Sequence, residues 1–342
     1  MCAIPRVRGS SHLYKRAPSL TNHPARRLLS LSSLIWVAMS WPILAKDPLQ
    51  DTLDPKYVKT GAMVSERDCS TIEETVWVVV DGHGDCIRYY GSGLKKGENP
   101  TVFLWFHGDR VQRQHAKGDF FKTTAQQVIA YADNRPQVLR AMMAAWVSEF
   151  AKPAIFIGRP GVYGSSGNHT HKRQPREVAL MDKALDALKS RYSIDSFIVA
   201  GQSGGGHVTA SLLAQRTDIA CAVLTSAPAA VRARNEIKKW PGDATGMTTF
   251  YDPIEHVHEI KGHARLRIFV VGDPRDKAVP FRTQQLYFEA LKASKLDAYL
   301  VPAKGSGQQF HGLGPLGMRM AGWCASGAAS KEILDKVAGE SR

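Results

Sequence analysis

The sequence predicts an α/β fold with one mostly parallel, eight-stranded sheet and helices on both of its faces. Three observations support this: short apolar runs of strand length, helical patterns between them, and an early pair of runs spaced as a hairpin. Several runs are apolar throughout, which is typical of parallel strands buried on both faces. In 342 residues, 44% are hydrophobic and 22% charged. That composition excludes a mainly disordered, collagen-like or disulfide-only chain.

Strands are expected wherever four to eight apolar or β-branched residues follow one another between polar segments. The first two runs are close enough to pair as a hairpin, and the later runs alternate with helices, so a mixed but mostly parallel sheet follows. The eight runs are residues 76–80, 86–90, 101–106, 154–158, 196–200, 221–225, 267–271 and 298–302.

Helices are predicted at residues 136–150, 174–193 and 281–294. In the second segment Val178, Met181, Leu185 and Leu188 recur at three- and four-residue spacing, which places them on one face of a helix.

Residues 46–342 are long enough for a single domain of this kind. Within it, residues 227–262 are the only candidate for a small cap.

Residues 1–45 have the build of a secretory signal peptide. Arg26 and Arg27 precede an apolar stretch at 28–44, and a small residue, Ala45, follows it. A positive region, a short apolar region and a small residue at the cleavage site are the marks of such a signal. The arginine pair matches a twin-arginine signal only loosely, and a signal anchor is the competing interpretation. We therefore expect a periplasmic or secreted protein with no stable membrane span after cleavage.

The net charge of +14 raises the question of a nucleic-acid partner. Residues 1–45 contribute six Lys and Arg and no acidic residue, so the remainder carries 39 basic against 31 acidic residues, or +8. That remainder has no basic run interleaved with aromatic residues, which argues against nucleic acid as a partner. A diffuse positive charge favours anionic substrates or a negatively charged envelope surface.

Four cysteines remain after the presequence: Cys69, Cys86, Cys221 and Cys324. Four cysteines in an exported chain permit two disulfides in three possible pairings. Cys69 and Cys86 bracket the apolar run at 76–80, so we expect them on neighbouring strands of a hairpin and favour that pair. No C-x-x-C pair occurs, so a zinc or redox site has little support. The alternative is four buried thiols.

The segment Gly201-Gln202-Ser203-Gly204-Gly205 stands between a predicted strand and a predicted helix. A serine hydroxyl becomes a useful nucleophile only when it is exposed, close to a base and next to amide donors. G-x-S-x-G at a strand-to-helix turn is the nucleophile elbow, which makes Ser203 the candidate nucleophile and the Gly204 amide a candidate oxyanion donor. The competing interpretation is a glycine-rich turn. Nucleotide binding is disfavoured because neither G-K-[ST] nor G-x-G-x-x-G occurs.

A second oxyanion donor is expected in the loop after the strand at 101–106, which ends in His107-Gly108-Asp109. In such architectures this loop turns close to the substrate carbonyl, and we assign the donor to the amide of Asp109. The Asp109 carboxylate is unusual beside a developing anion unless it points away. The alternative is that His107 only ends the strand.

Candidates for the catalytic acid and base follow the last two predicted strands. Asp276 precedes Val279 in a D-x-x-V-P pattern, whereas Asp273 directly follows the strand, so we favour Asp276 and treat Asp273 as a turn residue. His311 lies in the loop after the last strand. Ser203, Asp276 and His311 occur in the order nucleophile, acid, base, each after a successive strand.

These motifs make residues 70–340 resemble the α/β-hydrolase superfamily, and within it the secreted prolyl-oligopeptidase-like and dienelactone-hydrolase-like branch. The resemblance rests on GQSGGG, FHG, DKAVP and QFHG, with RPGVYGSSG at 159–167. It implies a Ser-Asp-His triad that hydrolyses an ester, or an amide as the alternative. Dienelactone hydrolases carry cysteine where this chain has Ser203, and a prolyl-oligopeptidase propeller does not fit into 342 residues.

We therefore expect an extracytoplasmic serine hydrolase that needs no metal or organic cofactor and acts on a small-molecule or oligomeric ester. A serine peptidase of the same fold is the alternative, followed by a non-catalytic binding protein. Tyr163 and Trp240 are candidate substrate contacts, each equally compatible with a place in the core. The natural substrate and the oligomeric state do not follow from the sequence.

Overall fold

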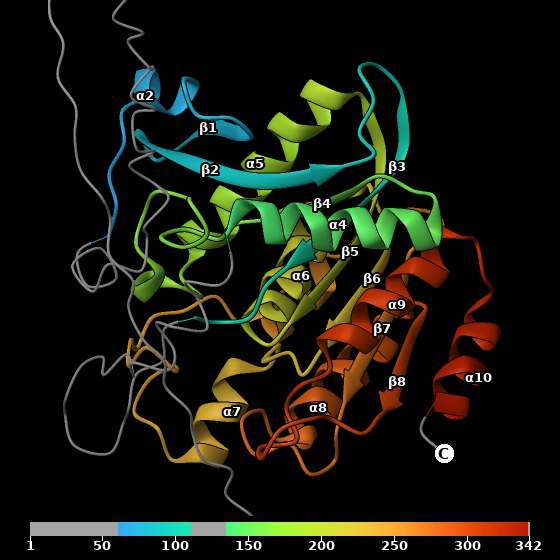
Figure 1. Ribbon diagram of the computed structural model, residues 1–342. Coiled ribbons are helices and arrows are strands. Elements are labelled where there is room, and N and C mark those ends of the chain that lie inside the picture. The colour runs from blue at the N-terminus through green and yellow to red at the C-terminus, as the bar shows by residue number, and fades with distance from the viewer. Residues whose placement is uncertain (1–60, 111–134, 341–342) are drawn as a thin grey trace, which may run out of the picture. The chain divides into compact units, whose positions relative to one another are not determined.

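The computed structural model describes residues 61–110 and 135–340, so the predicted presequence at 1–45 lies outside the described residues (Figure 1). The predicted fold class is confirmed: eight strands form a single sheet in the order β1-β2-β4-β3-β5-β6-β7-β8. The strands are β1 (Thr75–Val80), β2 (His83–Ser92), β3 (Asn99–Phe106), β4 (Ala154–Ile157), β5 (Ile194–Gln202), β6 (Ile219–Thr225), β7 (Arg267–Gly272) and β8 (Ala298–Pro302).

Each strand coincides with one of the eight apolar runs. β2 pairs antiparallel with β1 and β4, whereas β4, β3, β5, β6, β7 and β8 pair in parallel. In the parallel strands β3 to β7 most residues are buried on both faces, because helices cover each face of the sheet.

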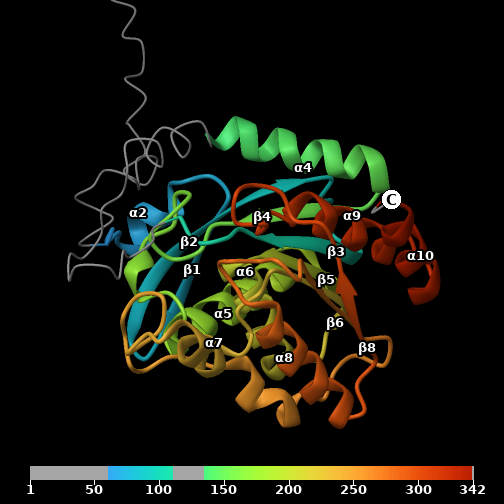
Figure 2. The same ribbon diagram turned by 90° about the horizontal axis from the view of Figure 1, so that it is seen from below.

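The helices form one layer on each side of the sheet (Figure 2). One face packs against α5 (Pro175–Tyr192), α6 (Gly204–Gln215), α8 (Phe281–Ala293) and the 3₁₀ segment η3 (Pro253–Glu259). The other face packs against α4 (Pro136–Phe150), α9 (Gly314–Ala325) and α10 (Ser330–Glu340). The expected helices at 136–150, 174–193 and 281–294 are α4, α5 and α8.

The sequence pattern does not predict α9 (Gly314–Ala325). Its sequence, GPLGMRMAGWCA, mixes glycine with apolar residues on most sides, because α9 packs against both the sheet and α4. A helix that is covered on several sides lacks the polar stripe that marks an amphipathic helix.

The cysteines form two disulfides, Cys69 with Cys86 and Cys221 with Cys324. The favoured pair Cys69–Cys86 is therefore confirmed, but its expected position is wrong in part. Cys69 lies on the short helix α2 (Glu66–Ser70) and only Cys86 lies on a strand. The polar segment before β1 folds into a helical turn because Ser65 caps it: Ser65 Oγ accepts a hydrogen bond from the Asp68 amide at 3.1 Å.

The candidate cap at 227–262 is the crossover between β6 and β7, and it contains α7 (Val231–Lys238) and η3. Asp252 holds the start of α7, since its carboxylate accepts hydrogen bonds from the amides of Val231 and Arg232 at 2.7 and 2.8 Å. Val257 of η3 belongs to the core beneath the sheet. At the other end, Arg234 of α7 donates to the carbonyl oxygen of Ala278 at 2.9 Å. This segment therefore packs partly into the core and partly against the loop after β7.

The parallel strands bring four loops to one edge of the sheet. The carboxyl ends of β3, β5, β7 and β8 lead into residues 107–109, 203, 273–276 and 303–311. In open parallel sheets this edge is where ligands bind, and it carries the predicted nucleophile, acid and base.

Candidate active site

Ser203 stands at the sharp turn between β5 and α6. Its backbone has φ 54° and ψ −119°, a region that residues with a Cβ rarely adopt and that costs about 1–3 kcal/mol. The Ser203 amide donates to the Thr225 carbonyl oxygen at 2.8 Å, which fixes the turn to β6. The residue is partly exposed, so the turn presents its side chain to solvent.

Glycine is required on the helix side of this turn because β3 passes very close. A Cβ on Gly205 would overlap the carbonyl oxygen of Phe106 at the end of β3. The close approach brings residues 107–109 against the nucleophile, and a Cβ on Gly108 would lie 3.4 Å from the Ser203 Cβ.

Asp276 and His311 form a pair. Asp276 Oδ2 lies 2.8 Å from His311 Nδ1, and Asp276 Oδ1 accepts from the amides of Ala278 and Val279 at 2.8 and 2.9 Å. The Asp276 side chain is fully buried, whereas that of His311 is 23% exposed. A buried carboxylate on Nδ1 orients the ring and stabilises the imidazolium, which leaves Nε2 for proton transfer.

Asp273, the competing carboxylate, has different partners. Its oxygens accept from the Arg275 side chain at 3.0 and 2.7 Å, from the Arg275 amide at 2.8 Å and from the Gly305 amide at 2.7 Å. The hydrogen bonds from Arg275 and the two amides lower the pKa of Asp273 to about 2. Asp273 therefore ties the loop after β7 to the loop after β8, and among the described residues it forms no hydrogen bond with His311.

Further contacts join the acid loop (residues 273–280) to the histidine loop (residues 303–312). The Lys277 amide donates to the Gln309 carbonyl oxygen at 2.9 Å. The Arg275 guanidinium lies 4.2 Å from the centroid of the Phe310 ring, within the range of a cation–π contact. Phe310 itself has φ 53°, so these contacts hold a strained backbone directly before His311.

Gln202 connects the elbow to the histidine loop: its Nε2 donates to the His311 carbonyl oxygen at 2.7 Å. Between the Ser203 hydroxyl and the His311 ring, no hydrogen bond is present in the described part of the chain. The structure thus pairs Asp276 with His311. The side chain of Gln202 links the main chain of His311 to the elbow.

His107 shapes the loop after β3. Its ring is buried, with Nδ1 2.7 Å from the Gly108 carbonyl oxygen and Nε2 accepting from the Arg159 amide at 3.2 Å. Burial, followed by the charge of Arg159, lowers the pKa of His107 well below its usual value. A neutral His107 with its proton on Nδ1 satisfies both contacts, so this residue fixes the turn.

The carboxylate of Asp109 lies beside Gly204 of the elbow, within a buried ionic cluster that we define as Asp109, Arg159, Arg173 and Glu177. Asp109 Oδ1 lies 2.9 Å from Arg159 Nη1, and Oδ2 pairs with Arg173. Arg159 also pairs with Glu177 at 2.7 Å. Burial raises the pKa of Asp109, but Arg173 and Arg159 outweigh it and hold that pKa well below its usual range. The Asp109 carboxylate therefore stays ionised beside the elbow, and the two arginines compensate its negative charge.

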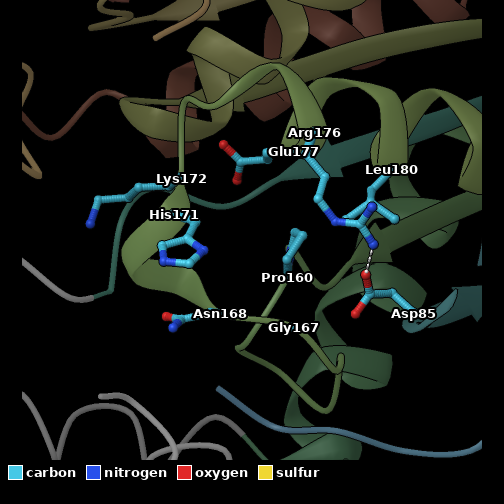
Figure 3. A pocket seen from close by; sticks show the side chains of 9 residues that line it. All are labelled: Asp85, Pro160, Gly167, Asn168, His171, Lys172, Arg176, Glu177 and Leu180. Atoms are coloured by element: carbon cyan, nitrogen blue, oxygen red, sulfur yellow. Dashed lines mark hydrogen bonds and ion pairs between the residues drawn. The ribbon is translucent and has the colours of Figure 1, made fainter. Parts of the chain in front are cut away.

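A small cavity of about 50 Å³ is lined in part by Glu177 (Figure 3). Its walls come from the loop after β4, the start of α5 and Asp85, which pairs with Arg176 at 2.6 Å. Ser203, Asp276 and His311 are not among its lining residues. The cavity is therefore separate from the candidate active site.

The two candidate substrate contacts differ in position. Tyr163 is 3% exposed and its ring packs 4.3 Å from the His107 ring, so it forms part of the core behind residues 107–109. Trp240 is partly exposed and stacks under the Arg234 guanidinium at 4.9 Å.

Sequence reasoning missed the ionic cluster apart from Asp109. Arg159, Arg173 and Glu177 are among the most deeply buried charged side chains, yet a sequence pattern assigns such residues to the surface. One signal was available, because Glu177 lies four residues before Met181, which places both on the same face of the predicted helix.

Within the described residues, no helix is long and apolar enough to cross a membrane. The same residues hold no group of histidine, cysteine and carboxylate side chains that could bind a metal ion.

The strand order, the antiparallel β2 and the strained serine between β5 and α6 define the α/β-hydrolase fold. No protein-family model matches the sequence, and no curated protein matches it. Solved structures with a similar arrangement have low sequence identity, so the fold assignment rests on the strand order and elbow of this chain.

Three such structures are enzymes of this fold. The acylaminoacyl peptidase of Pyrococcus horikoshii has 12% identity and a TM-score of 0.47 over 72% of this chain, which spans only 39% of that enzyme. The esterase Pf2001 of Pyrococcus furiosus has 16% identity and a TM-score of 0.46, covering 71% of this chain and 87% of its own. Est1E of Butyrivibrio proteoclasticus with bound ferulic acid has 14% identity and a TM-score of 0.47, covering 75% and 99%.

Proposed function

We propose that this protein is a serine hydrolase that cleaves carboxylic esters through an acyl-enzyme intermediate. The observation that carries the proposal is the pairing of buried Asp276 with partly exposed His311 at 2.8 Å, at the sheet edge that presents Ser203. A strained nucleophile elbow and an oriented histidine at one edge are the elements of acyl transfer.

The proposed reaction has two halves. Ser203 Oγ attacks the ester carbonyl carbon while His311 Nε2 takes the hydroxyl proton, and Asp276 stabilises the imidazolium. The imidazolium then gives this proton to the alcohol oxygen as the ester C–O bond breaks, which leaves an acyl group on Ser203. Water, deprotonated by His311, attacks the acyl carbon, and the proton returns to Ser203 Oγ as the acid leaves.

The oxyanion of each tetrahedral intermediate is assigned to the amides of Gly204 and Asp109. Gly204 is the first residue of α6, and Asp109 follows a residue that packs on Ser203. Neither amide donates a hydrogen bond to a described residue. One such donor contributes about 3–4 kcal/mol to the transition state in other hydrolases, and the helix N-terminus adds a partial positive charge.

We also propose that the enzyme acts outside the cytoplasm. Two disulfides support this, because structural disulfides persist in oxidising compartments. The predicted signal at 1–45 agrees with that location.

The nucleophile is tested by labelling with a fluorophosphonate, which reacts with activated serines. We expect the wild type to be labelled and Ser203→Ala not. Ser294→Ala, at an exposed serine after α8, is the matched control and should label as the wild type. Labelling that survives Ser203→Ala contradicts the assignment, and a wild type that neither labels nor hydrolyses supports a binding protein.

Ester and amide cleavage are separated by assay. A series of p-nitrophenyl esters of increasing acyl length is compared with peptide anilides under the same conditions. We expect hydrolysis of the esters, with the preferred chain length defining the acyl pocket. A higher kcat/KM on anilides would make the protein a peptidase instead.

A further inference from the structure

The side-chain amide of Gln202 forms hydrogen bonds with the main chain on both sides of Gly312. Its Nε2 donates to the His311 carbonyl oxygen at 2.7 Å, and its Oε1 accepts from the Leu313 amide at 3.1 Å. Gln202 is also the residue directly before the nucleophile. One side chain therefore joins the backbone of the base to the backbone of the elbow.

Thr225, buried at the end of β6, lies against this amide, whose orientation is fixed by the Leu313 amide and the His311 carbonyl oxygen. The Thr225 hydroxyl lies 3.0 Å from Gln202 Oε1 and 2.9 Å from the Gly201 carbonyl oxygen, and its one proton can be donated to either of these two acceptors. If the Gln202 amide were reversed, its NH₂ group would face the Leu313 amide donor. Only one orientation satisfies the partners, so the amide is a rigid spacer between two loops.

The opposite end of His311 is held by the acid loop. Asp276 fixes Nδ1 of the ring at 2.8 Å, while Gln202 fixes the carbonyl oxygen of the same residue. A ring held at Nδ1 and a backbone held at its carbonyl oxygen leave little freedom for Nε2. The strained backbone of Phe310, with φ 53°, needs such restraint.

From these contacts we infer that Gln202 is a positioning residue that sets the distance between Ser203 and His311. This inference rests on the proposed function, because it concerns the same proton transfer. Displacing a catalytic group by about 1 Å can cost about a hundredfold in rate. Gln202 would act on kcat through His311 without touching the substrate.

The first test is Gln202→Met, which keeps the length of the side chain and removes its hydrogen bonds. We expect kcat for ester hydrolysis to fall about ten- to hundredfold while KM changes less than about twofold. Gln202→Glu keeps an acceptor for Leu313 but cannot donate to His311, so it should lose kcat as well. Gln215→Met, at the far end of α6, removes one hydrogen bond to Tyr251 and should retain wild-type kcat.

The second test measures the same substitution without the base. In a His311→Ala background, Gln202→Met should cost no further activity, because a residue that acts through His311 has nothing left to position. A further loss of the same size in that background would overturn the inference, as would an unchanged kcat in Gln202→Met.

The outcome also separates this inference from the proposed function. If His311→Ala retains wild-type kcat, the assignment of the base fails whatever Gln202 does. If His311→Ala loses most of its kcat and Gln202→Met is fully active, only the inference on Gln202 fails. Thermal unfolding shows whether each variant folds. If Gln202→Met does not fold, the kcat of Gln202→Glu is measured in its place.

Discussion

The carboxylate of Asp109 occupies the space beside Gly204 where a side chain at position 204 would begin. A Cβ on Gly204 would overlap Asp109 Oδ1 and lie 2.6 Å from Arg159 Nη1. We predict that Gly204→Ala destabilises the fold by about 3 kcal/mol, at the upper end of typical overpacking costs. It should also lower kcat, because the shifted turn carries both Ser203 and the Gly204 amide. Urea unfolding and ester hydrolysis measure the two effects.

Gly339→Ala is the matched control. Gly339 lies in α10, and a Cβ there meets nothing within 4 Å, so this substitution should stabilise the helix by up to about 1 kcal/mol. A Gly204→Ala variant that behaves like Gly339→Ala would show that the Asp109 side chain lies elsewhere.

A second prediction concerns the charge of Asp109. Asp109→Asn keeps the shape of the side chain but leaves Arg173 with Asp243, 3.9 Å away, as its remaining acidic partner. An uncompensated charge in a buried network costs about 3–5 kcal/mol, so we expect a loss of that order in chemical unfolding.

Asp335→Asn is the control for that measurement. It breaks an exposed pair with Lys331 on α10, and such pairs contribute less than about 1 kcal/mol. Equal losses in the two variants would contradict a buried ionic cluster around Asp109.

Substitution of the two carboxylates of the acid loop, Asp276 and Asp273, should affect kcat to different extents. Asp276→Asn is expected to lower kcat by about four orders of magnitude, as loss of the orienting acid does in serine proteases. Asp273→Asn should lower kcat about tenfold, since it affects only the packing of the two loops. A larger loss in Asp273→Asn than in Asp276→Asn would reverse the assignment.

Asp273 also gives a pH dependence with a defined sign. Its pKa is about 2 in the folded protein, below the usual value of about 3.9 in an unfolded chain. The folded state therefore binds this proton less readily than the unfolded chain does. The contribution of ionised Asp273 to the free energy of unfolding is complete above about pH 4 and is lost as the pH falls towards 2. Asp273→Asn should flatten this part of the stability profile, measured by thermal unfolding.

The sequence was sufficient to predict the fold because each buried strand is a short apolar run and α4, α5 and α8 carry recognisable helical patterns. It also placed Asp276 ahead of Asp273 on spacing, and the structure pairs Asp276 with His311. The catalytic roles themselves stay predictions. Contacts between loops could not be predicted from the sequence. The hydrogen bond between Gln202 and His311 joins residues 109 positions apart, and no local sequence pattern indicates it.

Buried histidines should make the protein sensitive to acid. Burial, with the charge of Arg173, lowers the pKa of His207 to about 3, and burial likewise lowers the pKa values of His107 and His169. Because the unfolded chain binds these protons near pH 6.5, the free energy of unfolding should fall as the pH drops below that value. Each histidine contributes up to about 1.4 kcal/mol per pH unit within its window.

His207→Gln tests this slope. Gln can replace the hydrogen bond from Nε2 to the Tyr251 carbonyl oxygen, which is 2.9 Å in length, without titrating. Between pH 6 and 4 the free energy of unfolding of this variant should fall less steeply with pH than that of the wild type. The difference in slope corresponds to the uptake of about one proton on unfolding. His258→Gln, at a side chain that is 76% exposed, is the control, and an unchanged slope in His207→Gln would contradict the prediction.

The two disulfides should differ in what they contribute. Cys221–Cys324 closes a separation of 103 residues and Cys69–Cys86 one of 17, and in the chain-entropy model these loops stabilise by about 4.7 and 3 kcal/mol. We therefore predict that the paired replacement Cys221→Ala with Cys324→Ala lowers the Tm more than Cys69→Ala with Cys86→Ala. Calorimetry of both double variants is the measurement, each serving as the control for the other. The long closure also anchors α9, which begins three residues after His311, so its loss should reduce kcat near the Tm as well. A larger Tm loss from the Cys69 pair would mean that local packing around α2 outweighs the entropy of the long loop.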